Sequence, residues 1–382
     1  MRVPVCVLPL LVLAACSAAP ESAPAPRKPL EYAAAPKVRV LLASLGKPQK
    51  VLVRGEKLEF RAGERTLLRS KKGLLARQGD SLSLDGEPIG VDRITVSAAG
   101  LVQVDESTYS GTIEISVDEH LVIVNHVTIE DYVLGVLRGE LPLKEVPPAA
   151  AAAQAIAVRS YTLHYLALER DGFDVDDTTL YQRYVGFRRA PDDQHLRDGV
   201  LATIGQYLVR ADNSEPLKAY YHSTCGGHTT DPQRGLNADD TTPMRGVACE
   251  HCRASKYWRW EGRLESGAIA KAAGMGTATL RDVQVSERTP HGRAQAFLII
   301  TNDGAKSVPA NEFRLSVGPS ALRSTRVLEI ERDGGSFTFR GGGWGHGVGL
   351  CQMGAIGLAK KGKSGEEIVR YYYRDAEIRR AY

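Results

Sequence analysis

The chain has 382 residues, of which 43% are hydrophobic and 25% charged, a composition typical of a globular protein long enough for two substantial cores. Its 49 Lys and Arg residues against 45 Asp and Glu give a formal net charge of +4, and the basic residues are dispersed rather than gathered in runs. The composition excludes a disordered chain and argues against a nucleic-acid-binding surface.

The first residues predict secretion. An apolar run follows Arg2 and ends at Ala15; it is too short to span a bilayer but suits a signal-peptide core, so we expect residues 1–15 to be removed. The run ends in Leu-Ala-Ala-Cys, which resembles a bacterial lipobox and favours a lipid-modified Cys16 over a chance cysteine after an ordinary signal. The Pro/Ala-rich residues 16–37 predict a spacer between a bacterial membrane and a folded body outside the cytoplasm.

The folded body predicts an α+β class. Residues 38–119 contain short β-rich runs separated by Gly, Asp and Ser, and they carry no evident chemistry. Residues 120–382 mix helical and strand-like segments. Within them we expect an inserted α/β subdomain at about 260–335, with one alanine-rich helix and three or four strands.

Three further helices can be placed by their ends. Asp131 is expected to cap a short helix, and Pro148 opens an alanine-rich helix because proline is tolerated in a first helical turn. Ser364 followed by Glu367 is a capping-box pattern, which predicts a final helix.

The stretch GGGWGHGVGLCQMGA, residues 341–355, is unusually rich in glycine. Glycine permits positive φ and close approach to a ligand, and a helix beginning after Gly349 would present His346 near its free amides, which favour oxygen-rich partners. The motifs of nucleotide-binding loops are absent, so a nucleotide site is disfavoured. The alternative is a tightly packed turn with Trp344 as its plug.

Glu140 is a candidate acid. It lies on a loop between two apolar segments, where a partly dry pocket would raise its pKa and let it donate a proton near neutrality. The alternative is a solvated loop glutamate. Glu130, Asp131 and Glu145 are neighbouring candidates with less suitable surroundings.

The cysteines predict a metal site. His222, Cys225, Cys249 and Cys252 form two close pairs, the usual construction of a tetrahedral zinc site, and four protein ligands would make the zinc structural. His228 and His251 are substitutes for His222. Disulfides are the alternative, because four thiols remain, Cys351 included, in a compartment that can be oxidising.

Other polar side chains leave two interpretations open. Arg159, amid alanines, could reach substrate or an acidic loop, or could be an ordinary ion-paired group. Tyr220, Tyr221 and the tyrosines at 371–373 could stack on sugars, although aromatic residues in strands and helices usually belong to the core.

Four motifs, in this order, resemble the SpoIID/LytB family: IEDYVLGVLRGELP, AAAQAIAVRSYTL, YYHSTCGGHT and GGGWGHGVGLCQMGAIGLAKKG. The resemblance covers most of residues 120–380. It implies a lytic transglycosylase that cleaves peptidoglycan glycan strands, preferably those lacking stem peptides. Glu140 falls on the family's catalytic glutamate. Motif positions imply the following substrate-cleft residues: Arg159, Tyr161, Tyr221, His346 and Gln352.

By that resemblance, Glu140 would protonate the leaving glycosidic oxygen and then take the proton from the muramic C6 hydroxyl, which closes onto C1 as a 1,6-anhydro end. Because no water is activated, one carboxylate suffices. The glycines of 341–355 would let the chain pass close to a glycan, with His346 and Gln352 presented to its hydroxyls.

The chain also departs from the family. The lipoprotein tether and the β-rich N-terminal region put a role in sporulation in doubt, and Cys351 stands where many relatives have serine. Some family members enhance a separate cell-wall amidase, so a non-catalytic glycan-binding activator with an amidase partner is the alternative function.

Overall fold

The structure is a computed structural model that describes residues 31–142, 144, 146–187, 193–236 and 244–382. The predicted signal peptide at 1–15 and Cys16 lie outside the described residues, as does Glu145. No helix in the described ranges combines the length and apolarity needed to cross a membrane.

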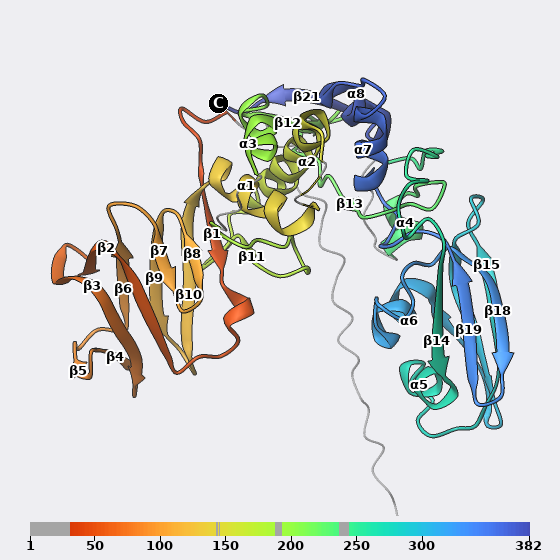
Figure 1. The fold of residues 1–382 in the computed structure, drawn as a ribbon. Coiled ribbons are helices and arrows are strands. Elements are labelled where there is room, and N and C mark those ends of the chain that lie inside the picture. The colour runs from red at the N-terminus through yellow and green to blue at the C-terminus, as the bar shows by residue number, and fades with distance from the viewer. Residues whose placement is uncertain (1–30, 143, 145, 188–192, 237–243) are drawn as a thin grey trace, which may run out of the picture.

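A large sheet forms the N-terminal part, on the left of Figure 1. Its strands run in the order β11-β1-β10-β9-β6-β2-β3-β4-β5, with β7 paired to β2 and β8 paired to β7. The strands are β1 (Lys37–Leu41), β2 (Lys50–Ala62), β3 (Arg65–Gln78), β4 (Ser81–Leu84), β5 (Glu87–Pro88), β6 (Arg93–Ser97), β7 (Val102–Val104), β8 (Ser107–Tyr109), β9 (Thr112–Val117), β10 (Leu121–Thr128) and β11 (Val175–Asp176). A short 3-10 helix, Ala43–Leu45, follows β1. All recorded pairs are antiparallel except β1 with β11.

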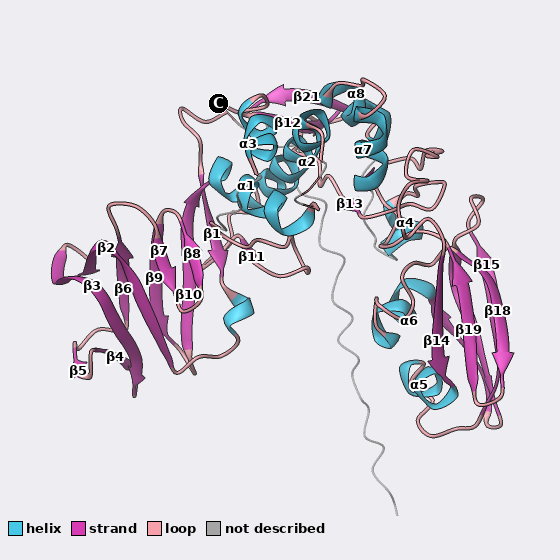
Figure 2. Cartoon of the chain, in the orientation of Figure 1, coloured by secondary structure: helices cyan, strands magenta, loops and turns pink. Residues whose placement is uncertain are grey.

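Helices form a second layer that packs beside this sheet (Figures 1 and 2). They are α1 (Ile129–Glu140), α2 (Pro148–Leu166), α3 (Gln194–Leu201), α7 (Gln352–Ala359) and α8 (Gly365–Tyr372). At the centre, α2 contacts the other four helices, and its small alanine side chains permit this close packing. Ile115 of β9 and Val158 of α2 belong to one continuous core, so the sheet and the helices are packed together.

The helix starts confirm two sequence predictions and correct one. Pro148 begins α2, and Ser364 with Glu367 forms the expected capping box of α8. The cap of α1 is Thr128, whose side chain accepts from the Asp131 N–H at 3.3 Å, so Asp131 is not the cap. After α8 the chain adds β21 (Ala376–Arg380), which pairs with β12 (Gln206–Arg210) and was not predicted.

A second unit with its own core lies on the right of Figure 1. Its elements are β14 (Trp260–Glu265), α5 (Ser266–Ala272), β15 (Leu280–Arg288), β16 (Ala294–Thr301), β17 (Gly304–Pro309), α6 (Ala310–Val317), β18 (Val327–Asp333) and β19 (Ser336–Gly341). Phe297, Phe313 and Phe339 are fully buried at its centre. The sequence predicted one helix here and missed α6.

Between the two units, β13 (Tyr221–His222) pairs in parallel with β20 (Leu350–Cys351), and α4 (Pro232–Leu236) lies nearby. The mixture of helices and mainly antiparallel sheets confirms the α+β class.

Candidate functional site

A cleft of about 660 Å³ opens between the helical layer and the second unit. One side is formed by the end of α1, by α2 and by the loop at 179–183; the other is formed by α6, Tyr257 and the glycine-rich stretch, with β13 between them. Five residues that the motifs singled out line this cleft together: Glu140, Tyr161, Tyr221, His346 and Gln352.

Glu140 is the last residue of α1 and is half-buried in the cleft. Its Oε1 accepts a hydrogen bond from the backbone N–H of Arg183 at 2.9 Å. The residue before it must be small, because a Cβ at Gly139 would lie 2.1 Å from the carbonyl oxygen of Arg183. Glycine at this position therefore lets the Arg183 loop approach closely enough to hold the carboxyl group.

Burial raises the pKa of Glu140 above its ordinary value, and three neighbouring interactions partly offset this. They are the Arg183 N–H, the Gln352 side chain and the Arg183 charge. The Gln352 side chain lies close enough to the carboxyl group to lower its pKa, although Gln352 Nε2 forms no hydrogen bond of normal geometry with a described residue. Glu140 thus has the environment of a proton donor, with an amide poised beside it.

Gln352 reaches the cleft through the pairing of β13 with β20. In this parallel pair Tyr221 lies opposite Leu350 and His222 opposite Cys351, and Gln352 then begins α7. The pairing carries the motif around Tyr221 and the motif around Gln352 to the same edge of the cleft, although they are distant in sequence.

The two predicted tyrosines also line the cleft. The Tyr221 hydroxyl donates to Gln182 Oε1 at 3.1 Å, and the Tyr161 hydroxyl lies 3.5 Å from that of Tyr165. Burial raises the pKa of both tyrosines, so each hydroxyl remains a hydrogen-bond donor at neutral pH.

His346 lies in the cleft, but its nitrogens are already used by the protein. The Val348 N–H donates to Nδ1 at 3.1 Å, so Nε2 carries the proton, and it donates to the Tyr221 carbonyl at 2.9 Å. Burial, together with the charge of Arg314, lowers the pKa of His346 to about 3. The expectation that His346 is presented to glycan hydroxyls is corrected: its ring is neutral and fastens the glycine-rich stretch to β13.

The glycines of this stretch pack against protein. Gly347 and Gly349 have φ of 87° and 68°. A Cβ at Gly347 would lie 2.2 Å from Cζ of Arg293, and one at Gly349 would lie 1.9 Å from the Tyr220 carbonyl oxygen. The tightly packed turn, which was the alternative interpretation, therefore describes these glycines better than close approach to a glycan.

Arg159 is not in the cleft. Its side chain is fully buried and donates to both carboxylate oxygens of Glu130, at 3.0 and 2.6 Å, and to the Gln206 carbonyl at 2.8 Å. This corrects the prediction that Arg159 contacts substrate: it is the ion-paired arginine of the alternative reading, and it joins α2 to the start of α1.

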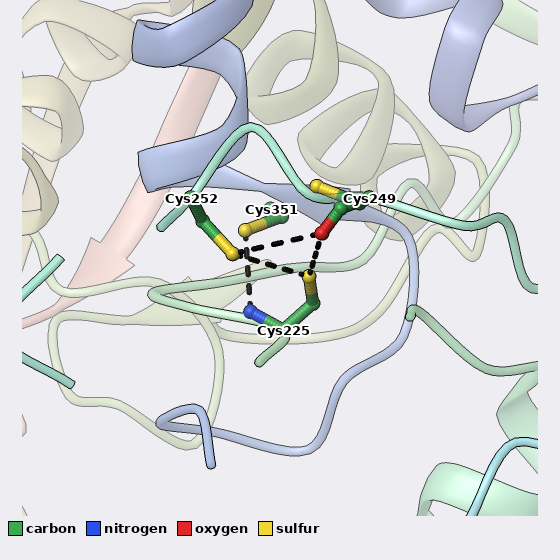
Figure 3. Close-up of side chains that lie close together, drawn as sticks. All are labelled: Cys225, Cys249, Cys252 and Cys351. Carbon is green, nitrogen blue, oxygen red and sulfur yellow. Dashed lines mark hydrogen bonds between the residues drawn. The ribbon is translucent and has the colours of Figure 1, made fainter. Parts of the chain in front are cut away.

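The structure changes one ligand of the predicted metal site. Figure 3 shows the side chains of four buried cysteines close together: Cys225, Cys249, Cys252 and Cys351. Their sulfur atoms all lie within 4.8 Å of one another. All four are free thiols in the structure. His222 is not part of this group, because its Nδ1 donates to the Val348 carbonyl at 3.0 Å and its ring lines the cleft. Cys351 takes its place.

The surroundings of the four sulfurs fit a zinc ion. Tetrahedral coordination with Zn–S bonds of about 2.3 Å separates sulfurs by about 3.8 Å, comparable to the observed spacing. Backbone N–H groups point at the sulfurs: those of Cys225 and Gly354 donate to Cys351 Sγ at 3.2 and 3.3 Å, and that of Gly227 donates to Cys225 Sγ at 3.4 Å. Such donors favour thiolates.

Two arginines near the cysteines also favour a negatively charged metal site. Arg293 is fully buried and donates to the Cys225 carbonyl at 2.8 Å, while the half-buried Arg326 also lies in the field of the cysteines. Among the described residues, no carboxylate forms an ion pair with either arginine. A zinc ion with four thiolates carries a formal charge of about −2, which two arginines would balance.

Sequence reasoning missed several cleft residues. Arg183 and Arg314 bring positive charge, and Tyr257 packs edge-to-face on Trp344 with ring centroids 4.2 Å apart. None of these four lies at a position that the motifs marked as functional. Trp344 stood inside the glycine-rich stretch, so its half-buried ring, which lines the cleft, could have been considered as a sugar-stacking surface.

Comparisons with known proteins agree with the resemblance that the motifs indicated. Residues 117–209 match the family model SpoIID, described as stage II sporulation protein, and residues 246–349 match DUF8618, a domain of unknown function. Stage II sporulation protein D of Bacillus subtilis is 27% identical over 68% of this chain and 76% of its own length.

Two further relatives bracket this match. An uncharacterized protein of Brachyspira hyodysenteriae is 29% identical over 71% of this chain and 72% of its own length. The amidase enhancer of Bacillus subtilis is 25% identical, over 62% of this chain but 39% of its own length. These matches support the SpoIID/LytB family that the four motifs resemble.

Proposed function

We propose that this protein is a lytic transglycosylase that cleaves peptidoglycan glycan strands outside the cytoplasm and leaves 1,6-anhydro-muramic ends. Its similarity to the SpoIID family model and to the relatives named stage II sporulation protein D and amidase enhancer supports a role in peptidoglycan processing. The observation that carries the finer proposal is Glu140, a carboxyl group of raised pKa in a cleft large enough for sugars.

The chemistry follows from the position of that carboxyl group. In its protonated form, Glu140 gives its proton to the glycosidic oxygen as the bond to C1 breaks; as carboxylate, it then removes the proton of the muramic C6 hydroxyl, whose oxygen bonds to C1. Gln352 and the Arg183 N–H stabilise the carboxylate that forms between these steps. Tyr161 and Tyr221 supply hydroxyls and ring surface for the glycan.

The number of carboxylates supports this route. Hydrolytic glycosidases use two carboxyl groups on opposite sides of the scissile bond. Among the described residues that line the cleft, Glu140 is the only acidic one. A single acid suits intramolecular attack by the C6 hydroxyl, in which no water has to be activated.

The test is Glu140→Gln, which keeps the shape and removes the proton donor. We expect anhydro-ended products from strands freed of stem peptides, measured by mass spectrometry, to fall by about 10²- to 10⁴-fold. The matched control is Glu366→Gln on the exposed face of α8, which should keep full activity. Undiminished products from Glu140→Gln would overturn the assigned role.

A second candidate function is a glycan-binding protein that activates a cell-wall amidase. It is favoured by the similarity to a relative named amidase enhancer. The same experiment separates the two: the activator co-sediments with cell wall, increases amidase product when the amidase is added, and makes no anhydro ends by itself.

We also propose that four cysteines hold one zinc ion: Cys225, Cys249, Cys252 and Cys351. The spacing of the sulfurs, the N–H donors and the unpaired arginines support this. Bound there, the ion would be structural, since four thiolates leave no position for water. The ligands would tie the loop at 249–252 to β13 and β20, and so fix Gln352, which directly follows a ligand.

A lipid anchor at Cys16 belongs to the same proposal. The lipobox-like sequence before Cys16 and the Pro/Ala-rich residues after it support attachment to a bacterial membrane through an N-terminal lipid. Such a tether would hold the cleft within reach of the wall.

A further inference from the structure

Arg314 is a buried cation at the edge of the cleft. It belongs to α6 of the second unit, is 6% exposed, and lines the cleft that also contains Glu140. Its Nε donates to the Arg323 carbonyl at 3.2 Å and its Nη1 to Asn311 Oδ1 at 3.3 Å. These two bonds hold the guanidinium in place without neutralising it.

The charge of Arg314 has no partner in the described part of the chain. No carboxylate forms an ion pair with it, and burial alone lowers its pKa to about 10, so it stays charged at neutral pH. By contrast, the two buried arginines of the helical layer form ion pairs, Arg159 with Glu130 and Arg138 with Asp193. Burying an unpaired charge is costly, so an anion from outside the protein would be favoured here.

The position of Arg314 restricts what the anion can be. Arg314 lies close enough to His346 to lower the pKa of that histidine, whereas the Glu140 carboxyl group accepts a hydrogen bond from the Arg183 N–H. When Glu140 is protonated, the described charges of the lining are those of Arg183 and Arg314, both positive. These two charges favour a substrate that carries a negative group.

Peptidoglycan offers one such group on every second sugar. Muramic residues carry a lactyl ether at C3, whose carboxylate is free only where the stem peptide has been removed; otherwise it is an uncharged amide. The family resemblance already implies a preference for strands without stem peptides. We propose that Arg314 is a residue that sets this preference, by binding the free lactyl carboxylate of a muramic residue. This rests on the proposed function for the nature of the polymer, and it assigns the selectivity to the second unit.

The test is binding to the Glu140→Gln variant, in which strands stay intact. Three ligands are compared: strands freed of stem peptides, the same strands with lactyl carboxyls converted to amides, and strands that keep their peptides. We expect the first to bind about 10- to 100-fold more tightly than the amidated strands, the range for a hydrogen-bonded charge. Adding Arg314→Met should remove this difference.

Matched variants exclude a general effect. Arg281→Met removes an exposed arginine of the same unit outside the cleft and should leave the preference intact, and Arg314→Lys should restore part of it. Thermal unfolding checks that Arg314→Met is folded. If it is not, Arg314→Gln, which also removes the charge, takes its place.

The outcomes separate the two proposals. Equal binding of free and amidated strands, or a preference that survives Arg314→Met, overturns the role of Arg314 while leaving the transglycosylase intact. Tight binding only of peptide-bearing strands also overturns it, because the anion would then be a peptide carboxylate. Binding of none of the strands contradicts the proposed function itself.

Discussion

The two sides of the cleft treat buried charge in different ways. In the helical layer, Arg159 is fully buried, and Glu130 neutralises it within the same unit. On the side of the second unit, Arg293 and Arg314 are buried equally well, and neither forms an ion pair with a described carboxylate. The ion pair of Arg159 stabilises the fold. The unpaired charges of Arg293 and Arg314 indicate that other anionic groups, such as metal-bound thiolates or a substrate, balance them.

The comparison of these arginines shows that a residue within a family motif need not lie in the cleft, and that a residue outside every motif can line it. Arg159 stands in the alanine-rich motif of the family, yet it joins two helices. Arg314 stands outside every motif, yet it lines the cleft. Arg293 donates to the Cys225 carbonyl and lies in the field of Cys225 and Cys351, where thiolates around a metal would balance its charge.

The largest effect is expected at the sulfurs. Cys351→Ser removes one of the four proposed ligands, so we expect bound zinc, measured by elemental analysis, to fall from about one per chain to near zero. Because loss of a structural metal is among the most destabilising changes, unfolding in denaturant should show a loss of more than about 4 kcal/mol.

His222→Ala is the matched control for the metal. It removes the ligand that the sequence suggested but the structure does not place among the sulfurs, and zinc content should be unchanged. Zinc lost with His222→Ala and kept with Cys351→Ser would reverse the assignment. Disulfides between these cysteines in the native protein, with no metal, would remove the site altogether.

The next effect is expected at the paired arginine. Glu130→Gln leaves Arg159 buried without a counter-charge, and breaking such a pair costs about 3–5 kcal/mol of unfolding free energy. Activity per folded molecule should be retained, since neither residue lines the cleft. Glu377→Gln, which breaks an exposed pair with Arg379, should change stability little. A Glu130→Gln protein of normal stability but weakened glycan binding would return Arg159 to the substrate site.

The part of the site that could be predicted is the part that local sequence encodes. Short family motifs marked Glu140, Tyr221 and Gln352, although Glu140 ends α1 and does not lie on the expected loop. A capping box gave the start of α8, and a proline gave that of α2. Each of these depends on residues close in the chain.

The other parts of the site depend on contacts between distant segments, which the spacing of residues along the sequence does not reveal. The choice of Cys351 over His222 is made by the parallel pairing of β13 with β20, which sets these two residues opposite each other. Each then turns to a different side: the sulfur joins the cysteine cluster, and the imidazole lines the cleft. Arg314 could not be found because the short helix α6 was itself missed among strands.

The smallest expected effect concerns the pH dependence of catalysis. Glu140 must be protonated to act as an acid, and burial raises its pKa, so the alkaline limit of activity should lie above the pH at which an ordinary glutamate ionises. The charge of Arg183 works in the opposite direction, because it stabilises the carboxylate. Arg183→Met removes this charge and keeps the backbone N–H that holds Glu140.

In Arg183→Met the pKa of Glu140 should therefore rise further, and the alkaline limb of the rate profile should move to higher pH. The shift should be modest, since Arg183 is exposed and solvent screens its charge. At roughly 1 M salt, where the screening length is about 3 Å, the variant and the parent should have the same profile. An alkaline limb that moves to lower pH, or a difference that persists at high salt, would mean that Arg183 acts on the substrate rather than on the acid. The unpaired positive charge of the cleft would then extend to both of its sides.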